Sequence, residues 1–182
     1  MHSRSNETNG GQAWHALHTR YQHEKAVAEI LTHEGFEIFL PLYPAIHQWK
    51  DRIKHLSLPL YPCYVFLRGG LDRKLQLLKT PGVHGIVGTA GRPGVIPESE
   101  ITAIRLAVEN TLHIQPHPFL KCGDRVRIKS GPLLGIEGIL VRKHDRYRLV
   151  LSVEMLGSSV AVEVDGSIVE RISSHQESGV FA

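Results

Sequence analysis

The segment that most constrains the fold is Leu60–Arg68, which reads Leu-Tyr-Pro-Cys-Tyr-Val-Phe-Leu-Arg. From Pro62 onward it has the composition of a β-strand, with aromatic, β-branched and aliphatic residues and little polar content. Such a run is typical of a central strand that is buried on most of both faces. Because proline has no N–H to donate to a sheet ladder, we expect Pro62 at the entrance of the strand.

Two tyrosines flank this proline and admit two interpretations. Tyr61 and Tyr64 each combine an apolar ring with a polar tip, so both suit a core position where the hydroxyl finds a hydrogen-bond partner. They equally suit an exposed hydrophobic patch that docks another protein. The segment alone leaves both interpretations open.

Length and composition set broad limits. A chain of 182 residues fits one or two small domains, and a formal charge of +3 permits contact with nucleic acid without demanding it. The 12 histidines are scattered, and Cys63 and Cys122 have no ligand-like neighbours. We therefore expect no metal site and no cofactor.

The same composition indicates a compartment. Two cysteines do not make a disulfide framework, which suits a reducing cytosol. The N-terminal residues are polar and contain no apolar signal region, and no apolar run is long enough to span a bilayer. We expect a soluble, cytoplasmic protein with no membrane partner.

The N-terminal part of the chain alternates strand and helix patterns. We expect residues 1–12 to be a disordered lead-in. The patterns then predict, in order, strand 14–19, helix 21–33, strand 36–43, strand 62–68, helix 71–80, strand 83–88 and a helix that begins near Pro97. This order is that of a ferredoxin-like α+β sandwich with an antiparallel sheet and the helices on one side of it.

Two of these helices carry specific expectations about their faces. In the first, an apolar stripe that includes Val27 and Leu31 predicts the buried side, and Glu24 falls on another face. In the second, the spacing predicts a core face and a basic face that points to water. The expected core residues are Leu71, Leu75 and Leu78, and the expected exposed residues are Arg73, Lys74 and Lys79.

A basic stretch with one tryptophan lies between the second and third strands. Residues 47–55 read His-Gln-Trp-Lys-Asp-Arg-Ile-Lys-His, and we interpret them as the tip of a long β-hairpin that projects from the domain. Such a tip can contact DNA, and it can equally be a solvated loop.

The chain changes character after the third helix. Residues 115–118, Gln-Pro-His-Pro, favour extended backbone and predict a linker. Residues 123–172 consist almost entirely of short strand patterns separated by turn signals, which indicates a small β-barrel.

Several motifs together carry a family resemblance. Residues 121–140 resemble a KOW motif, in which each glycine has a backbone role, and the barrel that carries it is SH3-like. Four further features complete the pattern. They are the tryptophan that opens the first β-α unit, the segment Leu60–Leu67, the run Pro81-Gly-Val-x2-Ile-Val-Gly and the Pro-containing linker. Over residues 13–172 the chain resembles the NusG family of transcription elongation and antitermination factors.

The resemblance implies a division of the chain and a type of family member. It implies a lead-in at 1–12, an N-terminal NGN domain at 13–113, a linker at 114–120, a KOW domain at 121–173 and a tail at 174–182. The family's usual small residue after the motif proline, often glycine, is Cys63 here, a mild departure because cysteine is small. A short connection between Arg68 and Pro81 is also more typical of a specialised paralogue than of the general factor.

The resemblance further implies a function without chemistry. The N-terminal domain would dock on the clamp helices of RNA polymerase, bridge the cleft to the opposite lobe and suppress pausing or termination. The barrel would recruit a further partner, such as Rho or a small-subunit ribosomal protein, and the protein would be a monomer. The implied polymerase-binding residues are His18, Tyr61, Pro62, Tyr64, Phe66, Arg73 and Lys74. The implied contacts to upstream or non-template DNA are Trp49, Lys50, Arg52 and Lys54.

Two other classes of function are less well supported by the residues. An enzyme would need paired carboxylates, a nucleophile with its base or a phosphate-cradling loop, and Gly91-Arg-Pro-Gly94 lacks the Lys-Ser/Thr of a P-loop. We therefore expect no catalytic residues. A ribosome-associated or RNA-binding KOW protein is the alternative, but it would need a denser basic face than this barrel offers, because its basic residues are nearly balanced by acidic ones.

Overall fold

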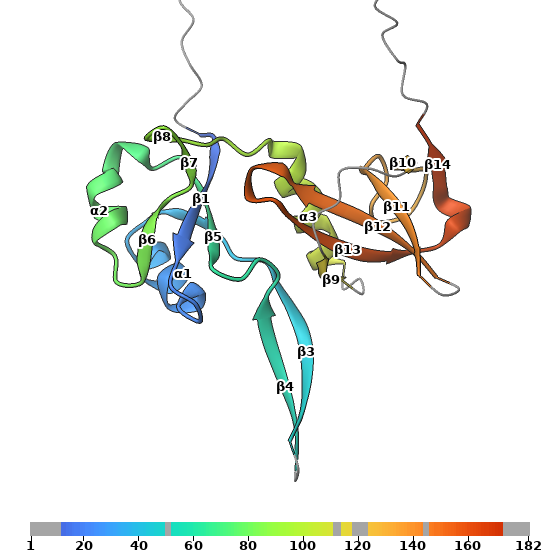
Figure 1. Ribbon diagram of the computed structural model, residues 1–182, viewed down its shortest axis with the longest axis horizontal. Coiled ribbons are helices and arrows are strands. Elements are labelled where there is room, and N and C mark those ends of the chain that lie inside the picture. Colours follow the sequence, from blue (N-terminus) through green and yellow to red (C-terminus); the bar gives the residue numbers. More distant parts are fainter. Residues whose placement is uncertain (1–11, 50–51, 111–113, 118–123, 144–145, 173–182) are drawn as a thin grey trace, which may run out of the picture.

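The computed structural model describes residues 12–49, 52–110, 114–117, 124–143 and 146–172 (Figure 1). An N-terminal α+β unit stands beside a β-barrel, and a long hairpin projects from the α+β unit. Nearly all of the expected lead-in, the whole expected tail and Lys50 lie outside the described residues. In the part of the chain that is described, no helix combines the length and the apolar character needed to cross a membrane.

The N-terminal unit is built on a four-stranded antiparallel sheet. Its strands are β1 (Trp14–Thr19), β2 (Glu37–Phe39), β5 (Tyr64–Arg68) and β6 (Val83–Ile86), in the order β2-β5-β1-β6. Strand β5 pairs with β1 on one side and with β2 on the other, so it is a central strand as expected. With helices connecting the strands, this confirms the ferredoxin-like α+β fold.

One face of this sheet is covered by the first two helical segments. Helix α1 (Glu24–His33) follows β1, and a 3-10 turn, η1 (Leu71–Arg73), leads into the short helix α2 (Lys74–Lys79). Burying apolar side chains between helices and sheet is the main source of stability for such a layer. The residues of this core are Leu17, Val27, Leu31, Phe36, Val65, Leu67 and Leu77.

The expected core face of the second helix is wrong. The structure buries Leu77 completely, whereas Leu75 is 75% exposed and Leu78 is 39% exposed. The α-helix begins only at Lys74, after the 3-10 turn, so the helical phase differs from that expected for one continuous helix. Leu77 therefore points to the sheet, and its two leucine neighbours point to solvent.

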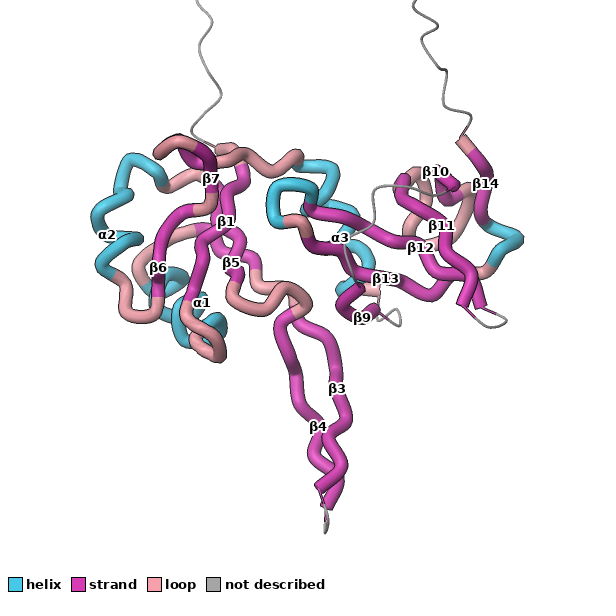
Figure 2. The backbone as a smooth tube through the Cα atoms, viewed as in Figure 1, coloured by secondary structure: helices cyan, strands magenta, loops and turns pink. Residues whose placement is uncertain are grey.

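The expected strand 36–43 is divided at Pro41. Strand β2 ends at Phe39, and the next strand, β3 (Leu42–Trp49), pairs only with β4 (Arg52–Pro59). Pro41 cannot donate to a ladder, and its carbonyl instead accepts a hydrogen bond from the Leu60 N–H at 2.9 Å. The chain therefore leaves the sheet at this point and forms the predicted projecting hairpin, which Figure 2 shows as a separate two-stranded ribbon.

The second face of the sheet is covered by helix α3 (Glu98–Glu109), so the expectation that all helices lie on one side is wrong. The Trp14 Nε1–H donates to Glu98 Oε2 at 2.9 Å, and the Arg105 guanidinium lies over the rings of Trp14 and Phe39. Buried residues of α3, including Ile104, share one core with Trp14 and its neighbours. A two-residue pair of strands, β7 (Gly88–Thr89) and β8 (Arg92–Pro93), lies between β6 and α3.

The C-terminal part forms the expected antiparallel β-barrel. Its sheet has the order β14-β10-β11-β12-β13-β9, and short 3-10 turns, η2 (Glu154–Leu156) and η3 (Gly166–Ile168), follow β12 and β13. The strands are β9 (Ile114–His117), β10 (Asp124–Ile128), β11 (Glu137–Lys143), β12 (Arg146–Val153), β13 (Ser158–Val164) and β14 (Val169–Arg171).

Strand β9 comes from the segment that the sequence predicts as a linker. Ile114–His117 pairs with β13, with Pro116 opposite Val160. Pro116 does not prevent this pairing, because β9 is an edge strand and an edge residue tolerates a missing N–H. The barrel sheet therefore begins before residue 121, and only part of 114–120 can serve as a linker.

The N-terminal α+β unit and the barrel contact each other in this structure. One hydrophobic core runs from Trp14 of β1 through Ile104 of α3 to Leu151 of β12. The loop after β8 also meets the barrel, because a Cβ atom built on Gly94 would overlap the sulfur of Met155 in η2. Gly94 thus lets the barrel approach the N-terminal domain closely.

We predict that Gly94→Val separates the two domains without unfolding either. The added side chain displaces Met155, so η2 of the barrel can no longer pack against this loop of the N-terminal domain. Small-angle X-ray scattering should show a larger radius of gyration while circular dichroism stays unchanged. Gly85→Val is the matched control, because a Cβ at Gly85 meets nothing within 4 Å. An unchanged radius for the Gly94 variant would show that this contact does not hold the domains together.

Candidate functional site

An exposed group of aromatic rings lies at one end of the N-terminal sheet. His18 of β1 is exposed and Tyr64 of β5 is half-buried, with 5.6 Å between their ring centroids. The exposed His84 of β6 lies 5.4 Å from His18 on the other side. Pro62, also exposed, precedes Tyr64 in the turn that enters β5. We call His18, Pro62, Tyr64 and His84 the aromatic patch.

Sequence reasoning missed His84. It lies in a strand pattern that contains no motif. The pairing of β6 with β1 brings it to His18: Gly85 lies opposite His18, and the register of the pairing shifts between His18 and Thr19. Strand pairing between distant segments is a property of the fold and not of local sequence, so no signal near His84 could have identified it.

Tyr61 and Phe66 lie in the core and not on this patch. Tyr61 is 2% exposed and its ring packs edge-on against the fully buried Phe66, with 5.4 Å between centroids. Burial raises the pKa of the Tyr61 hydroxyl well above its ordinary value, and the Glu100 carboxylate of α3 raises it further. The core interpretation therefore fits Tyr61, although its hydroxyl has no hydrogen-bond partner among the described residues. In this conformation neither ring offers a surface to a partner.

The turn before Tyr64 is fixed from two sides. The Cys63 N–H donates to Glu24 Oε1 at 2.8 Å, and the Cys63 carbonyl accepts from the Thr19 N–H at 2.8 Å. Glu24 is only 3% exposed, so the expectation that it faces away from the fold is wrong: the carboxylate satisfies a backbone donor of the turn. Burial, with a further effect of Glu24, raises the pKa of the Cys63 thiol. These bonds hold Tyr64 in one position relative to β1 and α1.

Cys63 stands in the left-handed region of backbone conformation, at φ 68°. Glycine adopts this conformation without the penalty that a Cβ atom brings. We expected the departure from the family's usual residue to be mild because cysteine is small. The structure shows that the departure affects the backbone conformation at position 63, and that side-chain size is not the issue.

We predict that Cys63→Gly raises the free energy of unfolding by about 1 kcal/mol, because it removes the left-handed strain. Chemical denaturation would measure the change. Cys63→Ala is the control, since alanine also lacks the thiol but keeps a Cβ atom, and it should give no gain. Equal stabilisation by both substitutions would trace the effect to the thiol and contradict the backbone argument.

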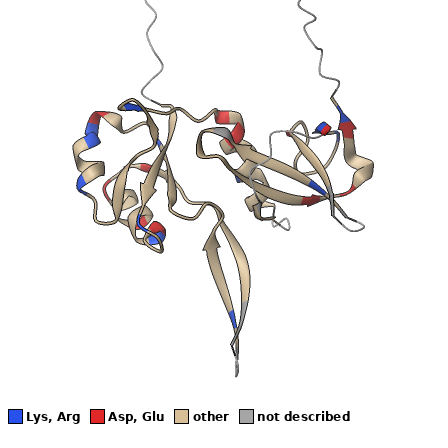
Figure 3. Cartoon of the chain, viewed as in Figure 1, with Lys and Arg blue, Asp and Glu red and all other residues tan. Residues whose placement is uncertain are grey.

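The hairpin places most of the predicted DNA-contacting residues at its far end. Trp49 and Arg52 are the last described register pair, and His47 pairs with the exposed Lys54 two residues nearer the base. Neither strand contains an acidic residue, and Figure 3 shows basic colouring near the tip.

The two residues expected to face the opposite lobe of the polymerase differ in their surroundings. The Arg73 guanidinium lies 3.7 Å from the centroid of the Phe36 ring and donates to the carbonyls of Glu34 and Gly35 at 3.1 and 3.3 Å. It therefore fastens η1 to the end of α1. Lys74 is exposed at the first position of α2.

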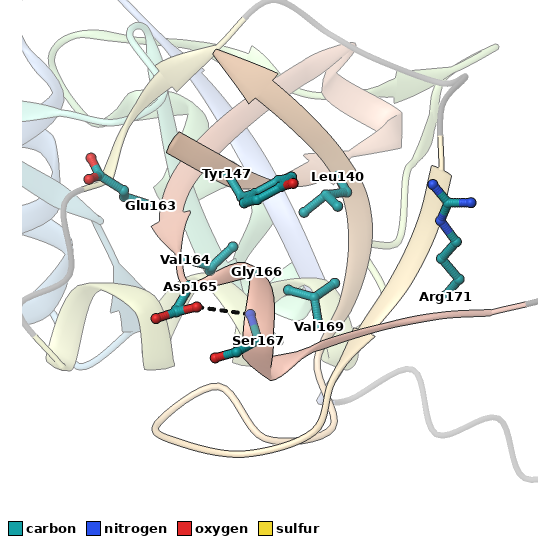
Figure 4. Close-up of a pocket in the computed structure, with 9 residues that line it drawn as sticks. All are labelled: Leu140, Tyr147, Glu163, Val164, Asp165, Gly166, Ser167, Val169 and Arg171. Carbon is teal, nitrogen blue, oxygen red and sulfur yellow. Dashed lines mark hydrogen bonds between the residues drawn. The ribbon is translucent and has the colours of Figure 1, made fainter. Parts of the chain in front are cut away.

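The barrel carries a pocket of about 650 Å³ beside η3 (Figure 4). The Tyr147 ring lies close against Gly166, where a Cβ atom would come within 2.7 Å of Tyr147 Cε2. Hydrogen bonds from Ser167 hold the pKa of the Asp165 carboxyl below its ordinary value, so this rim of the pocket is anionic at neutral pH. The lining residues are Leu140, Tyr147, Glu163, Val164, Asp165, Gly166, Ser167, Val169 and Arg171.

No metal centre is found in the described ranges, where no three His, Cys, Asp or Glu side chains gather closely enough to hold an ion. The features that the described residues do offer are surfaces: the aromatic patch, the hairpin, the outer side of α2 and the barrel pocket. Each of these can bind a macromolecule through apolar contact and charge.

Comparison with known proteins identifies the family. Residues 12–105 match a family model described as transcription termination factor NusG. Proteins named transcription termination/antitermination protein NusG from Staphylococcus carnosus (strain TM300) and Staphylococcus aureus (strain Mu50) are each 27% identical over 181 residues, covering 90% of this chain and 97% of the relative.

A solved structure supports the fold. The structure described as "Domain interaction in Thermotoga maritima NusG" has a TM-score of 0.56 and 21% identity, and the match covers 89% of this chain and 98% of that one. The family model spans more than half of the chain, and the ferredoxin-like sheet and the barrel agree with it. The chain belongs to the NusG family of transcription termination and antitermination factors.

Proposed function

We propose that the protein binds RNA polymerase through its N-terminal domain, suppresses pausing or termination, and recruits a further partner through its barrel. The observation that carries the proposal is the aromatic patch. It lies at an end of the sheet, it contains Tyr64 of the family's Tyr-Pro-x-Tyr motif, and its His18, Pro62 and His84 are exposed. Its proposed occupant is the clamp of the polymerase.

The patch is suited to binding because the fold holds it rigidly. Tyr64 follows a turn that is bonded to Glu24 and Thr19, and His18 lies in a strand that is paired on both sides. A surface that is already ordered before binding loses little conformational entropy in the complex. Aromatic side chains in such a position often carry much of the binding energy.

Tyr61 and Phe66 support the patch indirectly. Phe66 is two residues from Tyr64 on the same face of β5, and Tyr61 packs against it beneath α3. We propose that these two rings position the backbone of the Tyr-Pro-Cys-Tyr turn, and that His18, Pro62 and Tyr64 make the contact.

The other surfaces extend the proposed contact across the polymerase cleft. Lys74 on α2 would face the opposite lobe, and the hairpin would reach upstream or non-template DNA with Trp49, Lys50, Arg52 and Lys54. The described strands of the hairpin are free of acidic residues, which favours contact with phosphates. The protein would act as a cytoplasmic monomer.

The barrel would bind a second partner, with Rho and a small-subunit ribosomal protein as the candidates. We place this contact at or near the pocket beside Tyr147, because its lining combines apolar side chains, such as Leu140 and Val164, with the charged Asp165 and Arg171. For the barrel to act separately, residues 13–113 and 121–173 must behave as two domains. The contact between η2 and Gly94 would then have to open.

We predict opposite effects for the two tyrosines of the motif. Tyr64→Ala should weaken binding to purified RNA polymerase by roughly thirtyfold and abolish anti-pausing activity, while unfolding stays near that of the unchanged protein. Tyr61→Ala, the matched control, should instead cost about 3–5 kcal/mol of stability, because Tyr61 is buried.

Binding can be measured by fluorescence anisotropy and stability by chemical denaturation. If Tyr64→Ala binds polymerase normally, the docking surface lies elsewhere and the proposal fails. A pull-down of the tagged protein that yields ribosomes and no polymerase would favour the ribosome-associated alternative.

We predict that neutralising Lys50, Arg52 and Lys54 together weakens recruitment to transcription complexes. The salt dependence of binding should flatten by about one unit of slope for each DNA phosphate that the variant no longer neutralises. The control replaces the exposed Lys129, Arg125 and Arg171 of the barrel in the same way. A hairpin variant with an unchanged salt slope would show that the loop is only solvated.

A further inference from the structure

A methionine stands at the contact between the barrel and the N-terminal unit. The sequence contains two methionines, Met1 and Met155, and Met155 lies in η2, half-buried against the shared hydrophobic core. Its sulfur faces Gly94 so closely that a Cβ atom built on Gly94 would overlap it. That Cβ would also lie 3.2 Å from Met155 Cγ and 3.4 Å from Cε. The thioether therefore fills the space that the missing glycine side chain leaves.

The loop that carries Gly94 is fixed to the N-terminal sheet. The Gly94 N–H donates to the Val87 carbonyl at 2.8 Å, and the Gly94 carbonyl accepts from Nδ1–H of the buried His15 at 2.7 Å. Two residues further on, the Ile96 N–H donates to the Trp14 carbonyl at 2.9 Å. Because both polar atoms of the Gly94 backbone are bonded on this side, any group added to the sulfur has to be accommodated by movement of η2.

We propose that Met155 is a redox-sensitive contact, and that oxidation of its thioether to the sulfoxide separates the barrel from the N-terminal unit. The oxidant is a peroxide, such as hydrogen peroxide. The sulfur lone pair attacks one peroxide oxygen, so the S–O bond forms as the O–O bond breaks. The leaving hydroxide takes the proton of the attacked oxygen and departs as water. The sulfur is oxidised, the peroxide is reduced, and a methionine sulfoxide reductase restores the thioether.

Space is the first reason why the sulfoxide opposes the closed arrangement. Oxidation adds a heavy atom to the sulfur at a place where a single carbon on Gly94 has no room. Well-packed interiors accommodate an added atom only by shifting their neighbours. Since the Gly94 loop is bonded to β1 and to Val87, the shift falls on the barrel side of the contact.

Polarity is the second reason. A sulfoxide oxygen is a strong hydrogen-bond acceptor, whereas the thioether sulfur is apolar and accepts only weakly. In the closed arrangement the Gly94 N–H is already bonded to Val87, so it is not free to donate to the new oxygen. An acceptor buried without a partner is unfavourable, and water would satisfy it once the two parts separate. Oxidation therefore stabilises the open state relative to the closed state, which is the requirement for a shift between them.

The methionine is better placed for this role than the described cysteine. Burial raises the pKa of the Cys63 thiol, so little of the reactive thiolate is present at neutral pH. Cys63 also lies in the turn before β5, where it contacts Glu24 and Thr19 and not the barrel. Oxidation of Met155 would free the barrel for its proposed partner. In that respect the inference deepens the proposed function and rests on it, whereas the separation itself needs neither polymerase nor partner.

The test measures domain separation in the full chain before and after treatment with dilute hydrogen peroxide. A background with Cys63→Ala and Cys122→Ala removes the thiols, and mass spectrometry of peptides locates the added oxygen. We expect the radius of gyration from small-angle X-ray scattering to rise to that of Gly94→Val, with circular dichroism unchanged. Treatment with methionine sulfoxide reductase should return the original radius. An unchanged radius in protein that is oxidised at Met155 would overturn the inference.

Three variants of the same background serve as controls. Met155→Leu keeps an apolar side chain without sulfur, so its radius should stay small in peroxide. Adding Leu134→Met to Met155→Leu moves the methionine to a barrel position that is 63% exposed, and its oxidation should leave the radius unchanged. Met155→Gln places a polar group at the contact and should separate the domains without oxidant. Opening of either leucine variant by peroxide would trace the effect to general oxidation and contradict a role for Met155.

The outcomes also separate this inference from the proposed function. If Tyr64→Ala loses polymerase binding while oxidation at Met155 leaves the radius unchanged, docking through the aromatic patch stands and the redox-sensitive contact fails. If Tyr64→Ala keeps polymerase binding while oxidation opens the molecule, the proposed docking fails and the redox-sensitive contact stands.

Discussion

The structure depends on a sheet that is buried on both faces. Alternate residues of β5 point to opposite sides, so Val65 and Leu67 enter the core beneath α1 and α2, and Phe66 enters the core beneath α3. A strand under this constraint has one register only, because a slip by one residue would exchange the two cores. Tyr64, at the start of the strand, is then held at the rim of the sheet.

The same constraint explains why the candidate binding surfaces lie at the margins of the N-terminal domain. Helices cover both faces of the sheet, and the surfaces that remain exposed include its end, the outer side of α2 and the projecting hairpin (Figure 1). Each surface is fastened to the core by specific bonds, such as Glu24 to the Cys63 N–H and Arg73 to the end of α1. The domain can thus act as a rigid spacer with a different contact at each margin.

Helix α3 links the two halves of the molecule. One side of it packs on Trp14 and its neighbours, through the Glu98 hydrogen bond and the Arg105 contacts, and another side meets β12 of the barrel. The polar contacts hold α3 on the N-terminal sheet. A close contact between Gly94 and Met155 joins the barrel to the loop after β8 of the N-terminal unit. This arrangement favours α3 remaining with the N-terminal domain if the barrel moves away.

The sequence by itself determined the order of elements, the central strand, the projecting hairpin, the barrel and the family, because these follow from local periodicity, turn residues and motifs. Only the tertiary structure decided which side chains stay exposed. It buried Tyr61 and Glu24, turned Leu77 inward in place of Leu75 and Leu78, and brought His84 to His18. The physical reason is that exposure depends on which distant segment covers a residue, and on the phase at which a helix begins, neither of which a local pattern contains.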